Sequence, residues 1–424
     1  MHKDQWPHRN QAQEVAYRQQ LLKQLPEWQP EDDRVFAAGE HLTALAPFQE
    51  CLTGEMVLPV GIVGPLEIEL GQYAGFDAEG IPAESGRQRD KVYVPLAHTE
   101  GGLSVSMLRG MRAIQAAGGA KTYMLGDRMT RDSAFVFQSP DDAVAMQRWL
   151  TTHEAVLKTW IMQQGARGGP SVSSHAELQK ISVRLIGSVC HVLYGFYTHE
   201  ACGPNMMTRN AYALNQEILQ RIAKEGLHPD ALYLEANLGG DKKPSYEYFA
   251  GGHGKTVMAH IMLPDRVLSR HLHVTAQDLA DLEWTGLHGA HVSGMQSFAF
   301  TPASAVAAVF AATGQDLGMV GTSSMAEGAI RRVPGGISFS LTLGGVEVGT
   351  VGGGTQLPHA QTYLRMMKCQ GPGSSQRLAQ IIAGAALALE ISASASMASR
   401  HSRNFFQAHW LRGGERHAPP QETP

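Results

Sequence analysis

Residues 301–313 form the stretch that most restricts the fold of this chain. Pro302 is followed by a run of alanine, valine and phenylalanine that holds a single serine, and the run ends before Gly314. Proline suits the first turn of a helix, because the amide hydrogen that it lacks would have no partner there. A helix with almost no polar face must be enclosed by other elements. The run therefore predicts a buried central helix within a large α+β domain.

Asp316 follows this predicted helix almost immediately. The carboxyl end of a helix carries a partial negative charge, so a carboxylate is unfavourable there. We therefore expect Asp316 either to be solvated or to be held by a cation. Lys242 is a candidate for that cation.

Three charges lie in a turn of small residues between two apolar runs. Residues 231–234 and 255–262 are typical of buried strands. Between them stand Asp241, Lys242 and Lys243. Burial lowers the pKa of an ammonium group and a neighbouring carboxylate raises it, so the pattern suits a lysine that stays charged beside a developing oxyanion. A solvated turn with ordinary charges is the alternative interpretation.

Two further stretches allow a functional and a structural interpretation. Thr99 can cap a helix with Glu100 in its first turn, where the helix dipole stabilises the carboxylate as an ordinary cap. If Glu100 faces an apolar pocket instead, burial raises its pKa and makes it a general acid. The glycines of residues 349–354 allow a ligand to approach the backbone closely, although a structural turn explains them equally well.

Composition excludes several classes of protein. The 35 Lys and Arg residues against 39 Asp and Glu residues give a net charge of -4, which argues against nucleic acid or an anionic membrane as the main partner. The four cysteines have no C-x-x-C spacing, which indicates neither a disulfide framework nor a metal site. The N-terminus is polar and apolar runs stay below the ~20 residues of a membrane span. We expect a cytoplasmic protein with a small-molecule ligand.

The length of 424 residues is enough for two or three domains. Between about 132 and 233 strand and helix signals alternate, which indicates a small inserted α/β domain. The predicted division is a helical N-terminal segment at 1–53, a large domain at 54–131 and 234–412, the insert at 132–233, and a disordered tail at 413–424.

Five motifs in this order resemble the hydroxymethylglutaryl-coenzyme A reductase family, closer to its class I type and to the soluble catalytic portion only. They are the apolar Gly/Pro segment at 58–66, similar to the family's PVGVAGPL, the TEG of 99–101, the DKKP of 241–244, the GQD of 314–316 and the VGTVGGGT of 348–355. The resemblance covers residues from about 54 to 412.

The resemblance implies a fold, a reaction and an assembly. The insert would be a ferredoxin-like nucleotide-binding domain. The reaction would be the reduction of hydroxymethylglutaryl-CoA to mevalonate and free CoA, by two hydride transfers from NADPH, with NADH as an alternative. The site would lie between subunits of a homodimer or a higher homo-oligomer, and the apolar segment at 56–66 is hard to bury in a monomer.

The resemblance also implies roles for individual residues. Lys242 would hold the oxyanion, Glu100 would supply the proton, Asp316 would couple the two, and His409 would protonate the leaving thiolate. The substrate contacts carried over are Arg131, Asn237, Asp241 and Lys243. The cofactor contacts are Ser173, Asn205, Gly349 and Gly352.

Departures from the family motifs leave alternatives open. The cofactor loop at 200–206 contains a proline, and Ser173 is followed by serine where class I enzymes carry arginine near the 2′-phosphate. The segment at 299–304 lacks a histidine and an asparagine of the family. His401 competes with His409 as the catalytic histidine. A reductase of a different acyl-CoA and a CoA-binding homologue without catalysis are therefore alternative functions.

Overall fold

The computed structural model describes residues 11–31, 33, 51–77, 80–167, 172–250 and 252–413. The predicted helical N-terminal segment contains helix α1 (Gln11–Lys23), and residues 1–10, 32 and 34–50 lie outside the described residues. The predicted tail also lies outside them, apart from Gly413, which ends helix α13 (Arg403–Gly413).

A six-strand path organises the larger part of the molecule. The strands follow the order β2-β1-β3-β7-β9-β8, and neighbours are antiparallel except for the short parallel pairing of β1 with β3. Their bounds are β1 (Val60–Phe76), β2 (Pro82–Ala97), β3 (Ala120–Val136), β7 (Gly254–Pro264), β8 (Ala326–Val333) and β9 (Gly336–Val346). Along β7, buried and less buried residues alternate, because one face of the sheet packs on helices.

The predicted buried helix is present as α9 (Pro302–Thr313), and it packs against α12 (Ser374–Met397). α12 is longer than α9 and buried almost throughout its length, so two helices rather than one form the centre of the larger part. α3 (Leu103–Ala116) packs so closely on α12 that a Cβ at Gly110 would lie 1.7 Å from the Ala388 carbonyl oxygen. Only glycine fits there.

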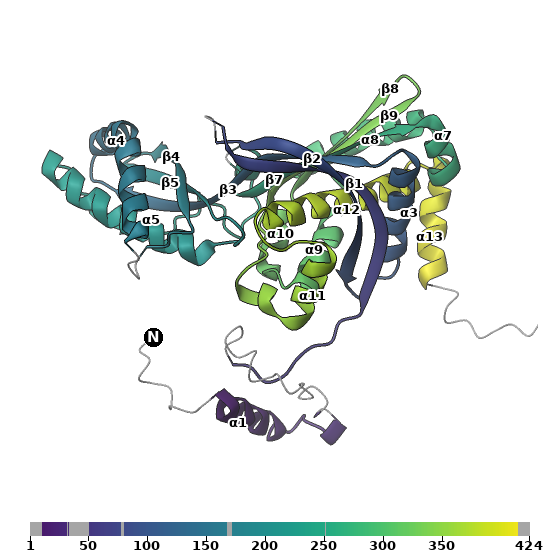
Figure 1. The fold of residues 1–424 in the computed structure, drawn as a ribbon, viewed down its shortest axis with the longest axis horizontal. Helices are drawn as coiled ribbons and strands as arrows, with labels where there is room; N and C mark the ends of the chain where they lie inside the picture. Colours follow the sequence, from purple (N-terminus) through teal and green to yellow (C-terminus); the bar gives the residue numbers. More distant parts are fainter. Residues whose placement is uncertain are drawn as a thin grey trace, which may run out of the picture.

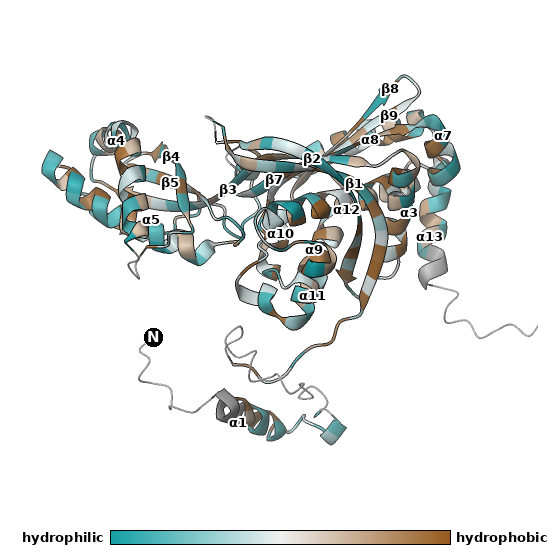
Figure 2. Cartoon of the chain, viewed as in Figure 1, coloured by the Kyte–Doolittle hydropathy of each residue, from teal (hydrophilic) through white to brown (hydrophobic). Residues whose placement is uncertain are grey.

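α12 is long and apolar enough to cross a membrane by length and composition, but 94% of its most apolar window is buried inside the protein. Figure 2 shows apolar residues along β1, α3 and α12, which face one another in Figure 1. α12 is therefore accounted for as a core helix. The remaining helices of this part are α6 (Glu247–Ala250), α7 (Asp265–Val267), α8 (Ala276–Ser293), α10 (Val320–Ser323) and α11 (Pro358–Met366).

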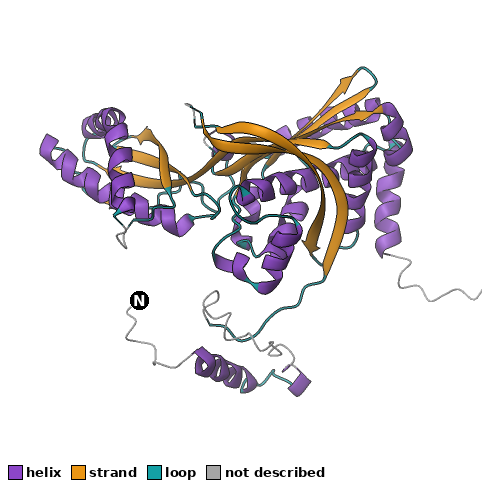
Figure 3. Cartoon of the chain, in the orientation of Figure 1, coloured by secondary structure: helices purple, strands orange, loops and turns teal. Residues whose placement is uncertain are grey.

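The second half of β3 enters a smaller part that has its own hydrophobic core. This part contains α4 (Pro140–Ala166), β4 (Glu177–Ile186), β5 (Val189–Tyr197), α5 (Pro204–Ile222) and β6 (Ala231–Tyr233). The strands pair antiparallel in the order β4-β5-β3-β6. The smaller part stands to the left in Figure 3 and is joined to the larger part through β3. The chain is thus a mixed α+β protein, as predicted, whereas the domain boundaries stay a prediction.

Of the two strands predicted to be buried on either side of Lys242, one is not buried. Residues 255–262 lie within the core strand β7, as expected. β6, in contrast, spans only three residues and leaves Tyr233 58% exposed. β6 also pairs with the far half of β3, in the smaller part, so Lys242 does not lie between two buried neighbours of one sheet. It lies where the chain passes from the smaller part to the larger part.

Candidate functional site

Lys242 and Asp316 form an ion pair, with 2.7 Å between Lys242 Nζ and Asp316 Oδ2. The contact inferred from the dipole of α9 is therefore confirmed. Asp316 uses its other carboxylate oxygen to accept a hydrogen bond from the Gly318 amide, at 2.9 Å, and so begins the short helix η5 (Leu317–Met319). A carboxylate at the amino end of this next helix is favourable, which offsets its place after α9.

The lysine of this pair stays charged. Its hydrogen bond to Asp316 raises the pKa of Lys242, and this effect exceeds the lowering by burial. About half of each side chain is exposed, which leaves the ammonium group open to a ligand. The backbone of Lys242 has a φ of 57°, in the left-handed region that non-glycine residues rarely adopt. Such conformations persist where the surrounding structure imposes them, and they cluster at functional sites.

Glu100 lies elsewhere, and the prediction that it sits in the first turn of a helix was wrong. α3 begins at Leu103, after Gly102, whose φ of 89° sets the turn into the helix. Glu100 is exposed in the preceding loop. Within the described part of the chain its carboxylate makes no hydrogen bond or ion pair. Neither capping nor burial accounts for Glu100 in this chain.

α12 separates Glu100 from the Lys242–Asp316 pair. At its amino end, Ser374 is hydrogen-bonded to Thr350. The residue before Thr350, Gly349, is hydrogen-bonded to Gln315, the neighbour of Asp316. Near its carboxyl end, Ser392 bonds Ser106, in the first turns of α3. The helix between these serines is about 27 Å long at ~1.5 Å per residue. Figure 1 shows α3 and α10 at opposite ends of α12.

Both candidate histidines lie beyond α12. His401 is in the 3-10 turn η7 (Arg400–Ser402) with a φ of 58°, and His409 is exposed within α13. His409 Nδ1 lies 2.9 Å from the Phe405 carbonyl oxygen, one helical turn earlier, and the two rings are in contact. The described residues after Ser399 therefore form the short turn η7 and then helix α13. α13, which contains His409, lies beside α3, the helix that follows Glu100 (Figure 1).

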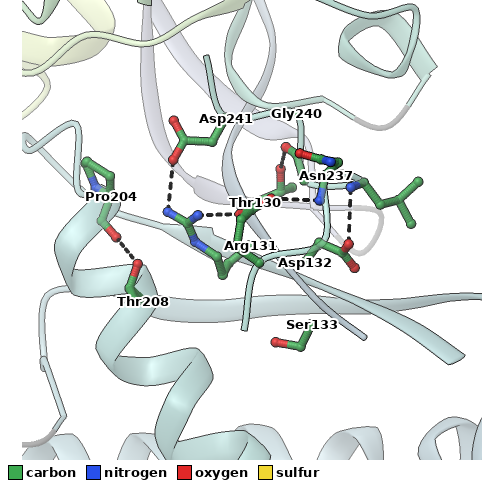
Figure 4. A network of polar contacts seen from close by, with 12 residues as sticks. Thr130, Arg131, Asp132, Ser133, Pro204, Thr208, Asn237, Gly240 and Asp241 are labelled. Atoms are coloured by element: carbon green, nitrogen blue, oxygen red, sulfur yellow. Dashed lines mark hydrogen bonds and ion pairs between the residues drawn. The ribbon is translucent and has the colours of Figure 1, made fainter. Parts of the chain in front are cut away.

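The expected substrate contacts gather next to Lys242. Arg131 is 8% exposed and donates from Nη2 to Asp241 Oδ2 at 3.0 Å, a contact that is drawn in Figure 4. Arg131 also donates from Nη1 to Glu235 Oε2, at 2.5 Å. Lys243 Nζ lies 3.7 Å from the other oxygen of Glu235, which also accepts the Asn237 amide at 2.9 Å. The structure thus brings all four expected contacts together around Glu235, which sequence reasoning had given no role.

Beneath Lys242 lies a buried network centred on Glu347, which sequence reasoning also missed. Glu347 is 1% exposed and accepts from the hydroxyl groups of Thr322 and of Tyr248, the latter at 3.2 Å. Its second oxygen lies 3.2 Å from His253 Nε2. The Tyr248 hydroxyl also lies 2.6 Å from the Gly240 carbonyl oxygen, so the two acceptors share its single proton. The network therefore ties the turn before Lys242 to the segment after Asp316, and the only signal in the sequence was one carboxylate within an apolar run.

Replacing Glu347 by glutamine tests whether this network holds the turn. We expect the variant to lose about 1–3 kcal/mol in the free energy of unfolding, because an amide cannot accept all of these hydrogen bonds and a buried donor is left unpaired. Urea unfolding followed by circular dichroism measures the loss. Glu217→Gln is the control, since Glu217 pairs with Arg221 within α5 and far from the site. Equal stability of both variants would show that the network contributes little to the free energy of unfolding.

Three of the four expected cofactor residues line one cavity of about 340 Å³ together with Asp316. Asn205 contributes from the first turn of α5, whose amino end faces the cavity. A Cβ at Gly352 would meet nothing within 4 Å, so its backbone is open to a ligand, whereas a Cβ at Gly349 would lie 2.5 Å from the Cys202 amide. Gly349 is thus explained by packing alone.

The proline in this loop is harmless to the helix. Pro204 occupies the first turn of α5, where its missing amide hydrogen would have no helical partner. The amino end of α5 therefore remains a place where amides and the helix dipole favour an anion such as a pyrophosphate.

Ser173, the fourth expected cofactor residue, lines a separate cavity of about 490 Å³ between α4 and β4. Its amide donates to Asn210 Oδ1 of α5 at 2.7 Å, which fixes the loop. Lys158 of α4 lines the same cavity and pairs with Glu154, which leaves one ammonium group near the serines.

The altered segment at 299–304 is held in place by a residue of α12. Glu390 of α12 accepts hydrogen bonds from the amides of Phe300 and Thr301, at 2.8 and 2.9 Å, and from the Thr301 hydroxyl at 2.6 Å. Burial raises the pKa of Glu390, although these hydrogen bonds oppose the rise. Glu390 thus fixes the chain just before α9.

Comparison with known proteins assigns the chain to a family. The family described as hydroxymethylglutaryl-coenzyme A reductase matches residues 14–412. The 3-hydroxy-3-methylglutaryl-coenzyme A reductase of Pyrococcus horikoshii is 31% identical over 361 residues, which cover 83% of this chain and 81% of that protein. The chain belongs to the hydroxymethylglutaryl-coenzyme A reductase family.

Relatives with longer chains and solved structures agree with this assignment. The reductase of Aspergillus terreus is 31% identical over 85% of this chain and 32% of its own length. A solved class II reductase of Streptococcus pneumoniae, bound to NADPH in open conformations, has a TM-score of 0.61 at 18% identity and covers 91% of this chain and 97% of that one. At this identity the structural likeness supports the fold of the reductase family alone. The class of this member stays a prediction.

Proposed function

We propose that this member of the family converts hydroxymethylglutaryl-CoA, two NADPH and two protons into mevalonate, free CoA and two NADP⁺. The observation that carries the proposal is the Lys242–Asp316 pair. A charged, half-exposed ammonium group is paired with Asp316, and Asp316 lines the same cavity as Asn205 and Gly352. A fixed cation beside a cofactor-sized cavity suits a reduction that passes through an oxyanion.

The residues of this chain account for the steps that follow each hydride transfer. NADPH supplies the hydride, which adds first to the thioester carbon and later to the aldehyde carbon. Lys242 stabilises the oxyanion each time, and Asp316 raises the pKa of Lys242 and holds its ammonium group in place. Breaking the carbon–sulfur bond releases the CoA thiolate, which a histidine protonates. Glu100 gives the proton that completes the alcohol.

NADPH would occupy the cavity that both parts of the molecule line and the second cavity in the smaller part. The amino end of α5 and the open backbone at Gly352 would take the pyrophosphate and the nicotinamide end, next to Asp316. Ser173 and Lys158 would face the 2′-phosphate from the second cavity. A serine in place of the arginine of class I enzymes weakens this contact, so we expect turnover with NADH as well, at a lower rate.

A second copy of the chain is required if Glu100 belongs to the site. Within one chain, α12 keeps Glu100 away from Lys242, so a partner subunit must supply one of them. The apolar residues needed for such a contact are exposed. They are Met56, Val57, Val60 and Ile62, just before and at the start of β1, and Trp284, Leu287, Val292 and Met295, on and after α8. Exposed patches of this kind mark association surfaces. We therefore propose a homodimer or a higher homo-oligomer.

Two finer proposals concern the smaller part and the compartment. The β3-α4-β4-β5-α5-β6 succession with the antiparallel order β4-β5-β3-β6 supports a ferredoxin-like nucleotide-binding domain. All four cysteines of the chain are free, which suits a reducing cytoplasm.

Nicotinamide absorbance tests the proposed function. Purified protein is mixed with hydroxymethylglutaryl-CoA and either NADPH or NADH, and mevalonate is measured by mass spectrometry. We expect oxidation of the nucleotide and formation of mevalonate, faster with NADPH. Oxidation of the nucleotide only when another acyl-CoA is supplied would favour a different reductase. No oxidation of NADPH or NADH with any acyl-CoA would favour a CoA-binding protein without catalysis.

The two histidines are separated by a partial reaction. If His409 protonates the departing thiolate, His409→Gln should reduce turnover of the thioester by about 10²-fold but spare reduction of added mevaldehyde, because the aldehyde step releases no thiol. His401→Gln should change neither rate. Steady-state rates with both substrates decide the matter, and the opposite pattern would assign the role to His401.

A further inference from the structure

The cations that the proposed function assigns to the substrate already have anionic partners within the chain. Arg131 and Lys243 both contact Glu235, and Arg131 also contacts Asp241. The third cation, Lys242, is paired with Asp316. Three positive charges therefore face three negative charges. A substrate carboxylate that approaches this cluster finds every cation neutralised, and it must compete with an internal carboxylate for its contacts.

Glu235 is the internal carboxylate that a substrate can replace. Its side chain is 33% exposed, whereas that of Asp241 is 17% exposed. The contact of Glu235 with Lys243 is long, at 3.7 Å, and half of the Lys243 side chain is exposed, so this pair is weak. The bond to Arg131 is short, and Arg131 is 8% exposed. Competition for a buried guanidinium has a larger energetic effect than competition for a solvated ammonium group.

Two polar atoms of the cluster are left unpaired within the described residues. Arg131 Nε and Asp241 Oδ1 are buried and have no hydrogen-bond partner. A buried donor or acceptor without a partner is costly, and such atoms are commonly paired when a ligand binds. A free donor and a free acceptor in one cluster suit a ligand that carries both an acceptor oxygen and a hydroxyl group. A hydroxy acid or a hydroxyacyl chain has both.

We propose that Glu235 is a specificity-determining residue that competes with the terminal carboxylate of the acyl chain for Arg131 and Lys243. A hydroxyacyl-CoA with a terminal carboxylate binds only after it displaces Glu235. A hydroxyacyl-CoA without that carboxylate has no group that competes with Glu235, so Glu235 stays paired with Arg131 and Lys243. Glu235 therefore reduces the degree to which this chain favours substrates with a terminal carboxylate over substrates without one. The proposal rests on the function proposed above.

Glutamine at position 235 removes the competition with little change of shape. Its amide oxygen can still accept the Asn237 amide that Glu235 Oε1 accepts now. Its neutral side chain binds Arg131 more weakly than a carboxylate does. The guanidinium is then available to a substrate carboxylate, and a charge-assisted hydrogen bond of this kind changes affinity by about tenfold or more.

The test compares two substrates that differ in the terminal carboxylate. The ratio of kcat/KM for hydroxymethylglutaryl-CoA to kcat/KM for 3-hydroxy-3-methylbutyryl-CoA is measured for the wild type, Glu235→Gln and the control Glu217→Gln. We expect Glu235→Gln to raise this ratio about tenfold, mainly through a lower KM for hydroxymethylglutaryl-CoA. The control should leave the ratio unchanged, because Glu217 also pairs with an arginine but lies on α5.

A binding measurement separates this proposal from the proposed function. Calorimetry with free 3-hydroxy-3-methylglutarate should show about tenfold tighter binding to Glu235→Gln than to the wild type, whether or not the protein turns over the thioester. Absence of turnover in all three proteins would overturn the proposed function alone. An unchanged or lower ratio together with unchanged or weaker binding would overturn the role of Glu235, because Glu235 would then be a support that positions Arg131.

Discussion

Replacing Lys242 by alanine is expected to lower thioester reduction by a factor of about 10²–10³ or more. The ammonium group acts mostly on the oxyanion, which forms only after the substrate has bound. Binding of CoA should therefore remain close to that of the wild type. Nucleotide oxidation measures the first effect, and calorimetric titration with CoA measures the second. Asp316→Asn should give a smaller loss, since Lys242 then keeps its charge but loses the carboxylate that fixes it.

Lys368→Ala is the matched control for this variant. Lys368 also has a left-handed backbone, with a φ of 58°, and also pairs with an aspartate, Asp90 at 3.0 Å, but it lies on the surface away from the cavity. We expect its activity to be that of the wild type. If Lys242→Ala kept near wild-type turnover, the assignment of the DKKP turn as the catalytic site would be wrong.

Two inactive variants should restore activity when they share a dimer. Glu100→Gln and Lys242→Ala each disable every site of their own homodimers. In a mixed dimer, one site would combine the intact Glu100 of one chain with the intact Lys242 of the other. Co-expression with two different tags yields the mixed species, and we expect about half of the wild-type rate per dimer, because one of its two sites is complete.

The separation along α12 makes this result decisive for the assembly. If both residues acted from one chain, each site of the mixed dimer would carry a defect and no activity would return. A mixed dimer carrying Glu100→Gln in both chains and Lys242→Ala in one is the control, and it should stay inactive. Recovery there would mean that Glu100 is not required.

The sequence predicted those features that depend on local patterns. The apolar run after Pro302 identified α9, since a helix without a polar face has few places to go. The dipole argument at Asp316 led to its contact with Lys242, 74 positions earlier, because the carboxylate needed a cation. In both cases a local feature required a distant partner: the apolar helix needed elements to bury it, and the carboxylate needed a cation.

Features that depend on distant partners could not be predicted in this way. Glu235 had no distinguishing pattern, and its role depends on Arg131, which reaches it from β3. Glu347 has four partners from two stretches of chain, 248–253 and 322–323, and each lies at least 24 positions earlier in the sequence. Glu100 was placed at a helix start by its spacing from Thr99, but the glycines that follow delay α3 until Leu103. The positive φ of Gly102 sets the start of α3 at Leu103.

The stoichiometry of the complete reaction tests the central claim most directly. Purified protein is given a limiting amount of hydroxymethylglutaryl-CoA with excess NADPH, and the NADPH consumed is compared with the CoA thiol released, as titrated with a thiol reagent. Two hydride transfers at one site predict about two NADPH consumed for each thiol, with mevalonate as the product. One NADPH for each thiol, with mevaldehyde left over, or thiol release without NADPH consumption, would contradict the account.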